Sequence, residues 1–327
     1  MNNRRKLIFS LGAGALATTF DSFAQPRDKV YRIGILFSNA AASAKWQVDV
    51  FIQALQEFGY VENKNILFEH RYAEGNFERL PPMAAELVQL KVDVIFVNNT
   101  PPALAAKQAT SSIPIVFAGV ASPVENGVVA SLARPGHNIT GTSNITTELT
   151  GKRLQILKEA FPKTVRIAVI NSIQPVSDLQ FSAVQSEAKK LGMDILRIEL
   201  RRREDFEQQY EQVRKGRADA LYPLDNAINN QLRNLLVDFA SQYQLPVIYG
   251  SKQYVDAGGL MSYGADLLAN YRRGAAFVDK ILNGAKPADL PVERPTKFEL
   301  VINMKTAKAL GMKISNSILV QATNVIE

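Results

Sequence analysis

The sequence contains no cysteine among its 327 residues. This absence excludes disulfide bonds, thiolate metal sites and cysteine nucleophiles. It also excludes a lipid anchor of the bacterial lipoprotein kind, because that signal needs a cysteine as the first mature residue. We therefore expect a protein without an attached lipid.

Histidine is almost as rare, with two residues in the chain. His70 falls in an expected strand and His137 in an expected loop, and neither belongs to an H-x-x-H or H-E-x-x-H pattern of a zinc site. The G-x-S-x-G motif of a hydrolase nucleophile, the P-loop and a G-x-G-x-x-G after a strand are absent as well. These absences predict no catalytic residues, no metal and no cofactor, and they argue against an enzyme.

Positive charge is in mild excess, and the basic residues are not concentrated in one part of the sequence. The formal net charge is +7 at pH 7, and the arginine run 201–203 is followed at once by Glu204 and Asp205. No helix-turn-helix pattern, arginine stripe or zinc spacing accompanies this excess. We expect a solvated basic surface and no nucleic-acid partner.

The start of the chain has the pattern of an export signal. The segment 3–6 carries the basic residues Arg4, Arg5 and Lys6, 7–20 form a mostly apolar stretch, and 22–24 supply the small residues that signal peptidase requires. The stretch is too short for a membrane anchor. We predict cleavage after Ala24 by way of either a twin-arginine or an ordinary Sec signal. An exported protein without an anchor is retained only by an outer membrane, so the periplasm is the expected location.

The rest of the chain alternates short apolar runs with amphipathic stretches, which is typical of parallel sheets covered on both faces by helices. One alternating set of strands and helices is expected at 32–37, 46–58, 66–72, 77–90, 92–97, 101–109 and 113–117. A second is expected at 147–160, 165–170, 177–191, 194–200, 204–215, 218–224, 226–243, 245–249 and 258–263. The sequence therefore predicts an α/β protein with two similar lobes.

The end of the chain is too short for a third domain. Helix 266–283, a proline-rich stretch at 287–295 and strand 298–302 are expected to return to the first sheet. The first lobe would then comprise 27–144 plus about 264–303, and the second about 145–263 plus 304–327. Several crossings of this kind make a hinge that permits closure around a ligand. Two consecutive, independent domains are the alternative.

Seven stretches, in order along most of the mature chain, carry a family resemblance. They are ALQEFGYVENKNI (54–66), MAAELVQLKVDVIFV (83–97), IPIVFAGVASPVENGVVASLARPGHNITGTS (113–143), GKRLQILKEAFP (151–162), DAGGLMSYGADL (256–267), ILNGAKPADLPVERPTKFELVINMKTAKALGMKI (281–314) and ATNVIE (322–327). Together they resemble the ABC-transporter substrate-binding proteins of the tryptophan/tyrosine-binding type. The resemblance implies a type I periplasmic-binding-protein fold, a small ligand held between the lobes, and delivery by a monomer to the membrane permease of an ABC importer.

The chain departs from this family pattern at two positions. Ser122 stands where the family usually has an aspartate, and His137 stands where it has a second glycine. Since Ser122 lies near the expected cleft, the first departure bears on the identity of the ligand more than on the fold.

Open parallel sheets bind ligands beyond the carboxyl ends of their strands, so the loops that follow strands supply the candidates. After the first strand, Ser38 and Asn39 can donate hydrogen bonds to a ligand. After the third, Asn99, Thr100 and Pro101 open a helix, with Thr100 as the expected N-cap. The free N–H groups and positive dipole end of that helix suit a carboxylate. Both loops have the alternative interpretation of a plain helix cap.

Asp225 and Asn226 follow strand 218–224. An unpaired carboxylate suits an ammonium group, although Asp225 can instead cap the next helix. The resemblance favours binding, because members that take amino acids have an Asp-Asn pair here. With Thr100 and Asp225 on opposite lobes, a zwitterionic ligand would bridge them and favour the closed state.

Weaker candidates follow the remaining strands. They are Ala121, Ser122, Asn171, Ser172, Gly250 and Ser251. Aromatic residues near the strand ends are expected either to line the cleft or to fill the core: Phe37, Trp46, Tyr222, Tyr249 and Tyr254. Two other functions stay open, namely a periplasmic sensor that presents its ligand-bound state to a membrane receptor, and an α/β hydrolase.

Overall fold

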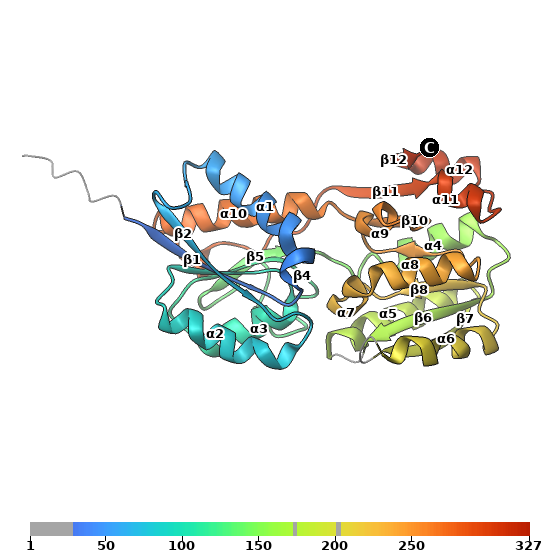
Figure 1. Cartoon of the computed structure of the whole chain (residues 1–327), viewed down its shortest axis with the longest axis horizontal. Helices are drawn as coiled ribbons and strands as arrows, with labels where there is room; N and C mark the ends of the chain where they lie inside the picture. The colour runs from blue at the N-terminus through green and yellow to red at the C-terminus, as the bar shows by residue number, and fades with distance from the viewer. Residues whose placement is uncertain (1–28, 173–174, 201–203) are drawn as a thin grey trace, which may run out of the picture.

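The computed structural model describes residues 29–172, 175–200 and 204–327. They form two lobes that lie side by side, with the start of the described chain in the first lobe and the C-terminus in the second (Figure 1). The export signal expected at 1–24 lies outside the described residues. Within the described ranges, no helix is long and apolar enough to span a membrane.

The first lobe is built on a parallel sheet of five strands in the order β2-β1-β3-β4-β5. The strands are β1 (Tyr31–Phe37), β2 (Ile66–Tyr72), β3 (Val94–Val97), β4 (Ile115–Val120) and β5 (Ile139–Ser143). The helices are α1 (Ala41–Glu57), α2 (Leu80–Gln89, after the 3-10 turn η1, Phe77–Arg79), α3 (Thr100–Ala109) and α10 (Leu267–Leu282). Side chains of α1 and α10 pack on one face of the sheet, and those of α2 and α3 on the other.

Helical spacing explains how α1 covers its face. Val48, Phe51 and Leu55 recur at intervals of three and four residues, and all three are buried against the sheet. Phe51 stacks on Phe96 of β3 with ring centroids 3.8 Å apart. The helix ends before Gly59, whose φ of +88° suits glycine, as the sequence predicted.

The second lobe holds two sets of strands that meet at one parallel bridge, between Leu221 and Val247. The first set has the order β7-β6-β8, with β6 (Arg166–Ser172), β7 (Asp194–Leu200) and β8 (Ala220–Pro223). The other has the order β12-β11-β10-β9, with β9 (Ile248–Tyr249), β10 (Met261–Ala265), β11 (Phe298–Asn303) and β12 (Asn324–Ile326). The helices are α4 (Thr150–Ala160), α5 (Pro175–Lys190), α6 (Asp205–Lys215), α7 (Ala227–Gln231), α8 (Arg233–Gln242), α9 (Lys252–Asp256), α11 (Met304–Ala309) and α12 (Asn316–Gln321).

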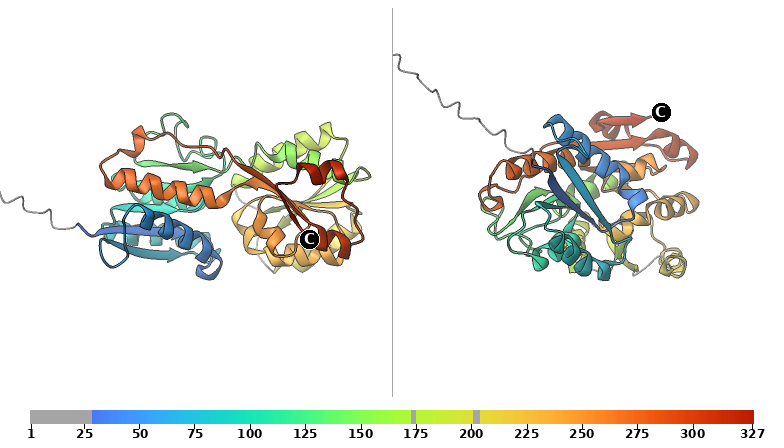
Figure 2. Two further views of the ribbon diagram at one scale, coloured as in Figure 1. Left: turned by 90° about the horizontal axis from the view of Figure 1, so that it is seen from above. Right: turned by 60° about the vertical axis from the view of Figure 1, so that its left-hand side comes forward.

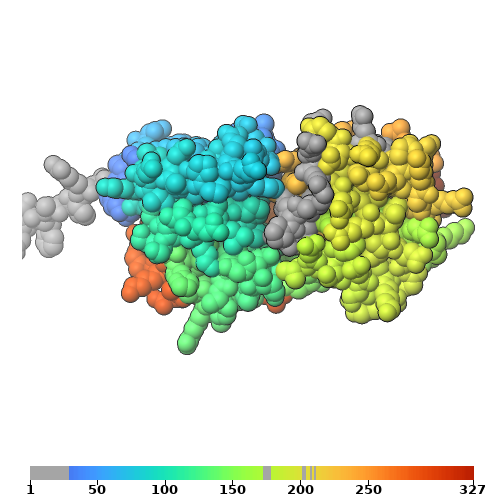
Figure 3. Space-filling model, turned by 90° about the horizontal axis from the view of Figure 1, so that it is seen from below, coloured from blue at the N-terminus to red at the C-terminus, as the bar shows by residue number. Residues whose placement is uncertain are grey.

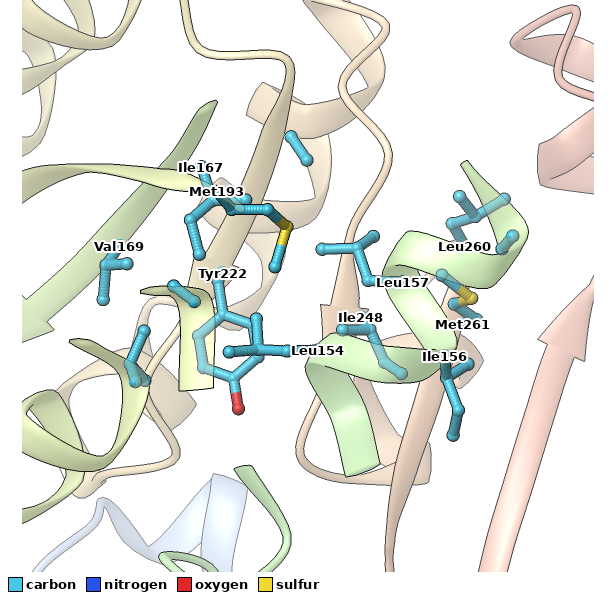
Figure 4. Packing of buried hydrophobic residues seen from close by; sticks show 14 of the residues in the cluster. Leu154, Ile156, Leu157, Ile167, Val169, Met193, Tyr222, Ile248, Leu260 and Met261 are labelled. Carbon is cyan, nitrogen blue, oxygen red and sulfur yellow. The ribbon is translucent and has the colours of Figure 1, made fainter. Parts of the chain in front are cut away.

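Helix α4 joins the two strand sets of the second lobe through the core. Leu154 and Leu157, one helical turn apart, are fully buried in a cluster with Tyr222 of β8 and Ile248 of β9. Figure 4 shows the ring of Tyr222 beside Leu154. Tyr222 was one of the aromatics considered for the cleft, and it belongs to the core instead.

The chain passes between the lobes three times. It leaves the first lobe between β5 and α4, returns at the start of α10, and leaves again between Glu293, which pairs with Thr142 of β5, and β11. Figure 2 shows α10 and β11 as two neighbouring segments that run in opposite lobes. The lobes therefore share a hinge of three segments.

Most expected elements are present within a few residues, and β2 and β7 have the predicted bounds. Helices expected at 77–90 and 226–243 are each divided, into η1 with α2 and into α7 with α8. The sequence did not predict strand β5, nor α9, α11, α12 and β12.

One strand expected in the first sheet lies in the other lobe. β11 pairs antiparallel with β10, and Leu300 and Ile302 are buried in the core cluster of the second lobe. The reason is that the chain reverses direction after α10 and returns beside the strand that precedes that helix. The exact division of residues between the lobes stays a prediction.

The fit of β10 against the loop after β9 can be tested at Gly264. A Cβ atom there would lie 1.9 Å from the carbonyl oxygen of Gly250. We expect Gly264→Ala to lower the free energy of unfolding by about 1–3 kcal/mol, because the backbone must move apart. Gly151→Ala is the control, since its Cβ would meet only the flexible side chain of Glu187, at 3.3 Å. Equal stability of the two variants in urea denaturation would show that this backbone contact is not tight.

Candidate functional site

A cleft lies where the two lobes face each other and encloses about 1050 Å³, open solvent included. Figure 3 shows the lobes meeting along a boundary, the first in blue to green and the second mainly in yellow. The lining is dominated by neutral amides from both lobes: Asn39, Gln47, Asn98, Asn99, Asn144, Gln180, Asn226, Asn230, Gln231, Gln253 and Asn270. The cleft therefore offers many directional hydrogen bonds and little charge.

The first-lobe wall is held by a chain of hydrogen bonds between the loops after β1 and β3. Asn99 Nδ2 donates to Ser38 Oγ at 2.6 Å, and Asn98 Nδ2 donates to Asn39 Oδ1 at 2.7 Å. Asn39 Nδ2 in turn donates to Gln47 Oε1 of α1 at 3.2 Å. Ser38, Asn39 and Asn99 all line the cleft, as expected from their places after strands.

The start of α3 differs in detail from the expectation. Asn99 is the N-cap and Thr100 is the first helical residue, so the cap lies one residue earlier than predicted. Thr100 is buried and lines the cleft together with Pro101. Because Pro101 and Pro102 carry no N–H, the helix start offers a ligand the N–H groups of Asn99 and Thr100 and the hydroxyl of Thr100.

Asp225 lines the cleft from the second lobe, at the end of β8. It was expected to be unpaired, and this is wrong. Thr146 Oγ1 donates to its Oδ2 at 3.2 Å, and Asn230 Nδ2 donates to its Oδ1 at 3.3 Å. A guanidinium nitrogen of Arg153 lies 4.0 Å from Oδ2. These partners fix the carboxylate toward the cleft, and 14% of the side chain stays exposed to meet a ligand.

Arg153 is the site residue that sequence reasoning missed most clearly. Its side chain is 4% exposed and donates to three backbone oxygens: Tyr263 O at 2.6 Å, Gly250 O at 3.3 Å and Thr146 O at 3.4 Å. These oxygens belong to β10, to the loop after β9 and to the crossing before α4. In the sequence Arg153 is one cation on an amphipathic helix, with no signal that distinguishes it from a surface residue.

Three more expected residues of the second lobe lie close to Asp225. Asn226 lines the cleft and caps α7 by accepting from Asn229 N at 2.9 Å. Ser251 lines the cleft as well. Gly250 does not line it, but a Cβ there would lie 2.7 Å from Asp225 Oδ2. Gly250 thus gives the carboxylate room.

Of the remaining expected residues whose side chains the structure describes, one lines the cleft and the others are not among its lining residues. Ala121 lines the cleft, whereas Ser122 is not among the lining residues; it has φ of +40° and donates to Thr147 Oγ1 at 3.2 Å. Asn171 is 1% exposed outside the lining. Ser172 ends β6, and its side chain lies outside what the structure describes.

Fewer aromatic residues line the cleft than the candidates in the sequence permitted. Trp46 lines the cleft and meets Tyr271 of α10 edge to face, with ring centroids 5.4 Å apart. Tyr271 was not predicted, because it lies on a helix that returns from the second lobe. Phe37, Tyr249 and Tyr254 are core residues.

Several buried polar atoms of the lining have no hydrogen-bond partner within the described chain. They are Asn99 Oδ1 and Asn270 Nδ2 on the first lobe, and Asn226 Nδ2, Gln253 Oε1 and Arg233 Nε on the second. A buried polar atom without a partner is costly, so these atoms indicate where ligand atoms belong. No cluster of residues suited to a metal ion occurs among the described residues.

A polar cleft between two α/β lobes on a three-segment hinge defines a two-lobed ligand-binding protein of the periplasmic-binding type. The chain belongs to the ABC transporter substrate binding protein family, whose model matches residues 32–326. It is 32% identical over 266 residues to a tyrosine-binding protein of Clostridioides difficile, covering 80% of this chain and 76% of that protein.

Two solved structures share the fold of this chain. One is an ABC domain from Streptococcus pneumonia in complex with L-Trp, at 24% identity and TM-score 0.84 over 90% of this chain and 99% of that one. Another is a substrate binding protein with adhesive properties from Clostridium difficile in its ligand-free, open form, at 26% identity and TM-score 0.66 over 91% and 99%.

Arg153 provides a test of how the cleft is supported. We expect Arg153→Gln to lower the free energy of unfolding by about 3–5 kcal/mol, because it leaves Asp225 without its cation and three carbonyls without a donor. Arg166→Gln, at an exposed ion pair with Asp194, should cost less than about 1 kcal/mol. The double variant Arg153→Gln with Asp225→Asn should recover part of the loss. Urea denaturation measures all three, and a small effect of Arg153→Gln alone would refute the supporting role.

Proposed function

We propose that this protein is the periplasmic binding component of an ABC importer and that it takes an α-amino acid or a related zwitterion. The observation that carries the proposal is the position of Asp225, a fixed and partly exposed carboxylate facing the cleft. An ammonium group is the ligand group that best matches it. The tyrosine-binding relative supports the same class of ligand.

The opposite wall supplies groups for a ligand carboxylate. The N–H groups of Asn99 and Thr100 and the Thr100 hydroxyl lie at the positive end of the α3 dipole. A zwitterion that spans from there to Asp225 interacts with both lobes only when they are closed. Such a ligand therefore favours the closed arrangement by its differential affinity.

An aromatic ligand side chain has a place to pack. Trp46 and Tyr271 form an edge-to-face pair within the cleft lining, both on the first lobe. Offset or edge contacts with such a pair contribute roughly 0.5–1.5 kcal/mol beyond area burial. This supports an aromatic amino acid as one member of the ligand class.

The other functions differ in their observable consequences. A sensor would use the same cleft with a membrane receptor as partner, and capture of the closed protein by an ABC permease in membranes would distinguish the two. A hydrolase would convert the bound compound, whereas we expect intact ligand to be recovered. A monomeric protein without catalytic activity is part of the proposal.

Asp225→Asn tests the amino-group site. L-Tyrosine and L-tryptophan should stabilise the mature protein in thermal unfolding, since they bind only the native state. The variant should bind them about 30-fold more weakly or worse, because the amide cannot neutralise an ammonium. Asp256→Asn, at an exposed ion pair with Lys252, should bind as the wild type does. Unchanged affinity in a folded Asp225→Asn protein would reject the amino-acid assignment.

Export is testable at the N-terminus. We expect the protein recovered from the periplasm of a Gram-negative host to begin at Gln25, as cleavage after Ala24 requires. Mass spectrometry of the intact protein measures this. Arg4→Lys with Arg5→Lys should block export if a twin-arginine signal is used, and should leave a Sec-exported protein unchanged.

A further inference from the structure

Arg233 lines the cleft and has no role in the function proposed above. It is the first residue of α8, on the same lobe as Asp225. Its Nε is buried and lacks a hydrogen-bond partner, and the side chain forms no ion pair with a described carboxylate. A guanidinium group that lines a binding cleft and forms no ion pair suits the carboxylate or phosphate oxygens of a ligand.

Apart from Arg153 at Asp225, the arginines of the described chain that pair with carboxylates do so outside the cleft lining. Arg71 pairs with Glu86 at 2.6 Å, Arg294 pairs with Glu148 at 3.1 Å, and Arg273 pairs with Glu293. Arg233 differs from them because the other described lining residues are uncharged apart from Asp225, whose carboxylate pairs with Arg153. The lack of an ion-pair partner therefore distinguishes Arg233, in the cleft, from these arginines outside it.

The charged residues around the cleft carry an excess of positive charge, which a zwitterion with no net charge does not compensate. Asp225 and Arg233 are the acidic and the basic residue of the lining, and Arg153 stands behind Asp225 at 4.0 Å. Asp225 is thus already countered from within the protein, and the cationic charge of Arg233 remains. A ligand with net charge −1 compensates it, whereas a ligand with no net charge leaves a partly desolvated cation uncompensated.

Arg233 and Asp225 also lie near the same buried ring. Burial raises the pKa of the Tyr254 hydroxyl well above its ordinary value, and the charges of Asp225 and Arg233 act on it in opposite directions. Asp225 and Arg233 both line the cleft from the second lobe, so we expect a ligand whose amine binds at Asp225 to reach Arg233 with its side chain. Gln253 Oε1, buried and unpartnered, is another polar atom of this lobe in the lining.

We propose that the ligand carries a second anionic group beyond its α-carboxylate, and that Arg233 holds this group and selects for it. Within the proposed class, the preferred ligand is then an α-amino acid with an acidic side chain, of net charge −1 at neutral pH. This inference rests on the proposed function for the position of the amine at Asp225, and it adds the charge of the side chain.

Matched pairs of probes test the inference by isothermal titration calorimetry on the mature protein. The pairs are L-glutamate with L-glutamine, and 4-carboxy-L-phenylalanine with 4-carbamoyl-L-phenylalanine. In at least one pair, the anionic member should bind about tenfold tighter or more. Arg233→Gln should abolish this preference and leave the affinity for the neutral member nearly unchanged. Arg233→Lys should retain part of the preference, because it keeps the charge without the planar fork.

Arg214→Gln is the matched control, since Arg214 lies on α6 of the same lobe and is paired with Glu211 at 2.8 Å outside the cleft. Equal binding of the two members of both pairs would overturn the inference. So would an equal loss for both members in Arg233→Gln, which would assign Arg233 to the α-carboxylate.

An amine-free pair, terephthalate with 4-carbamoylbenzoate, distinguishes this inference from the proposed function. Tighter binding of terephthalate that depends on Arg233, with no amino acid bound, supports Arg233 as the anion site and rejects the amino-acid assignment. Binding of neutral amino acids that depends on Asp225 and not on Arg233 gives the opposite result.

Discussion

The cleft depends on one buried guanidinium. Burying a cation is unfavourable unless its donors and its charge are both compensated, and Arg153 meets this condition with three backbone oxygens and the carboxylate of Asp225. Those partners come from β10, from the loop after β9, from the crossing before α4 and from the end of β8. The same contact set that stabilises the second lobe therefore orients the acidic group of the binding site. Gly250, which has no side chain to obstruct that carboxylate, completes the arrangement.

The first lobe holds its binding residues in place without charged side chains. Its loops after β1 and β3 are joined by amide and hydroxyl hydrogen bonds that run from α1 to the start of α3. A wall whose side chains are already ordered loses less conformational entropy when a ligand binds. The two walls therefore differ in how they bind. The first-lobe wall is neutral and offers ordered hydrogen-bonding groups, whereas the second-lobe wall carries the formal charges of Asp225 and Arg233.

The parts that could be predicted follow from the geometry of parallel sheets. Since the carboxyl ends of parallel strands share one edge, residues after strands such as Ser38, Asn99 and Asp225 could be grouped without a structure, and they do line one cleft. Arg153, Arg233 and Tyr271 could not be grouped with them. Each lies on a helix, and its position in the sequence does not show whether its side chain belongs to the cleft. The antiparallel return of β11 was hidden for a related reason, as an isolated apolar run does not reveal its partner strand.

The three crossings between the lobes have a consequence for the order of events during binding. Because the lobes are tethered at three points, the groups of one lobe remain at a high effective concentration near the other even when the cleft opens. Closure is then a unimolecular step whose rate does not depend on how much protein is present. Once a ligand has bound one wall, the other wall reaches it by this intramolecular step, without a further search.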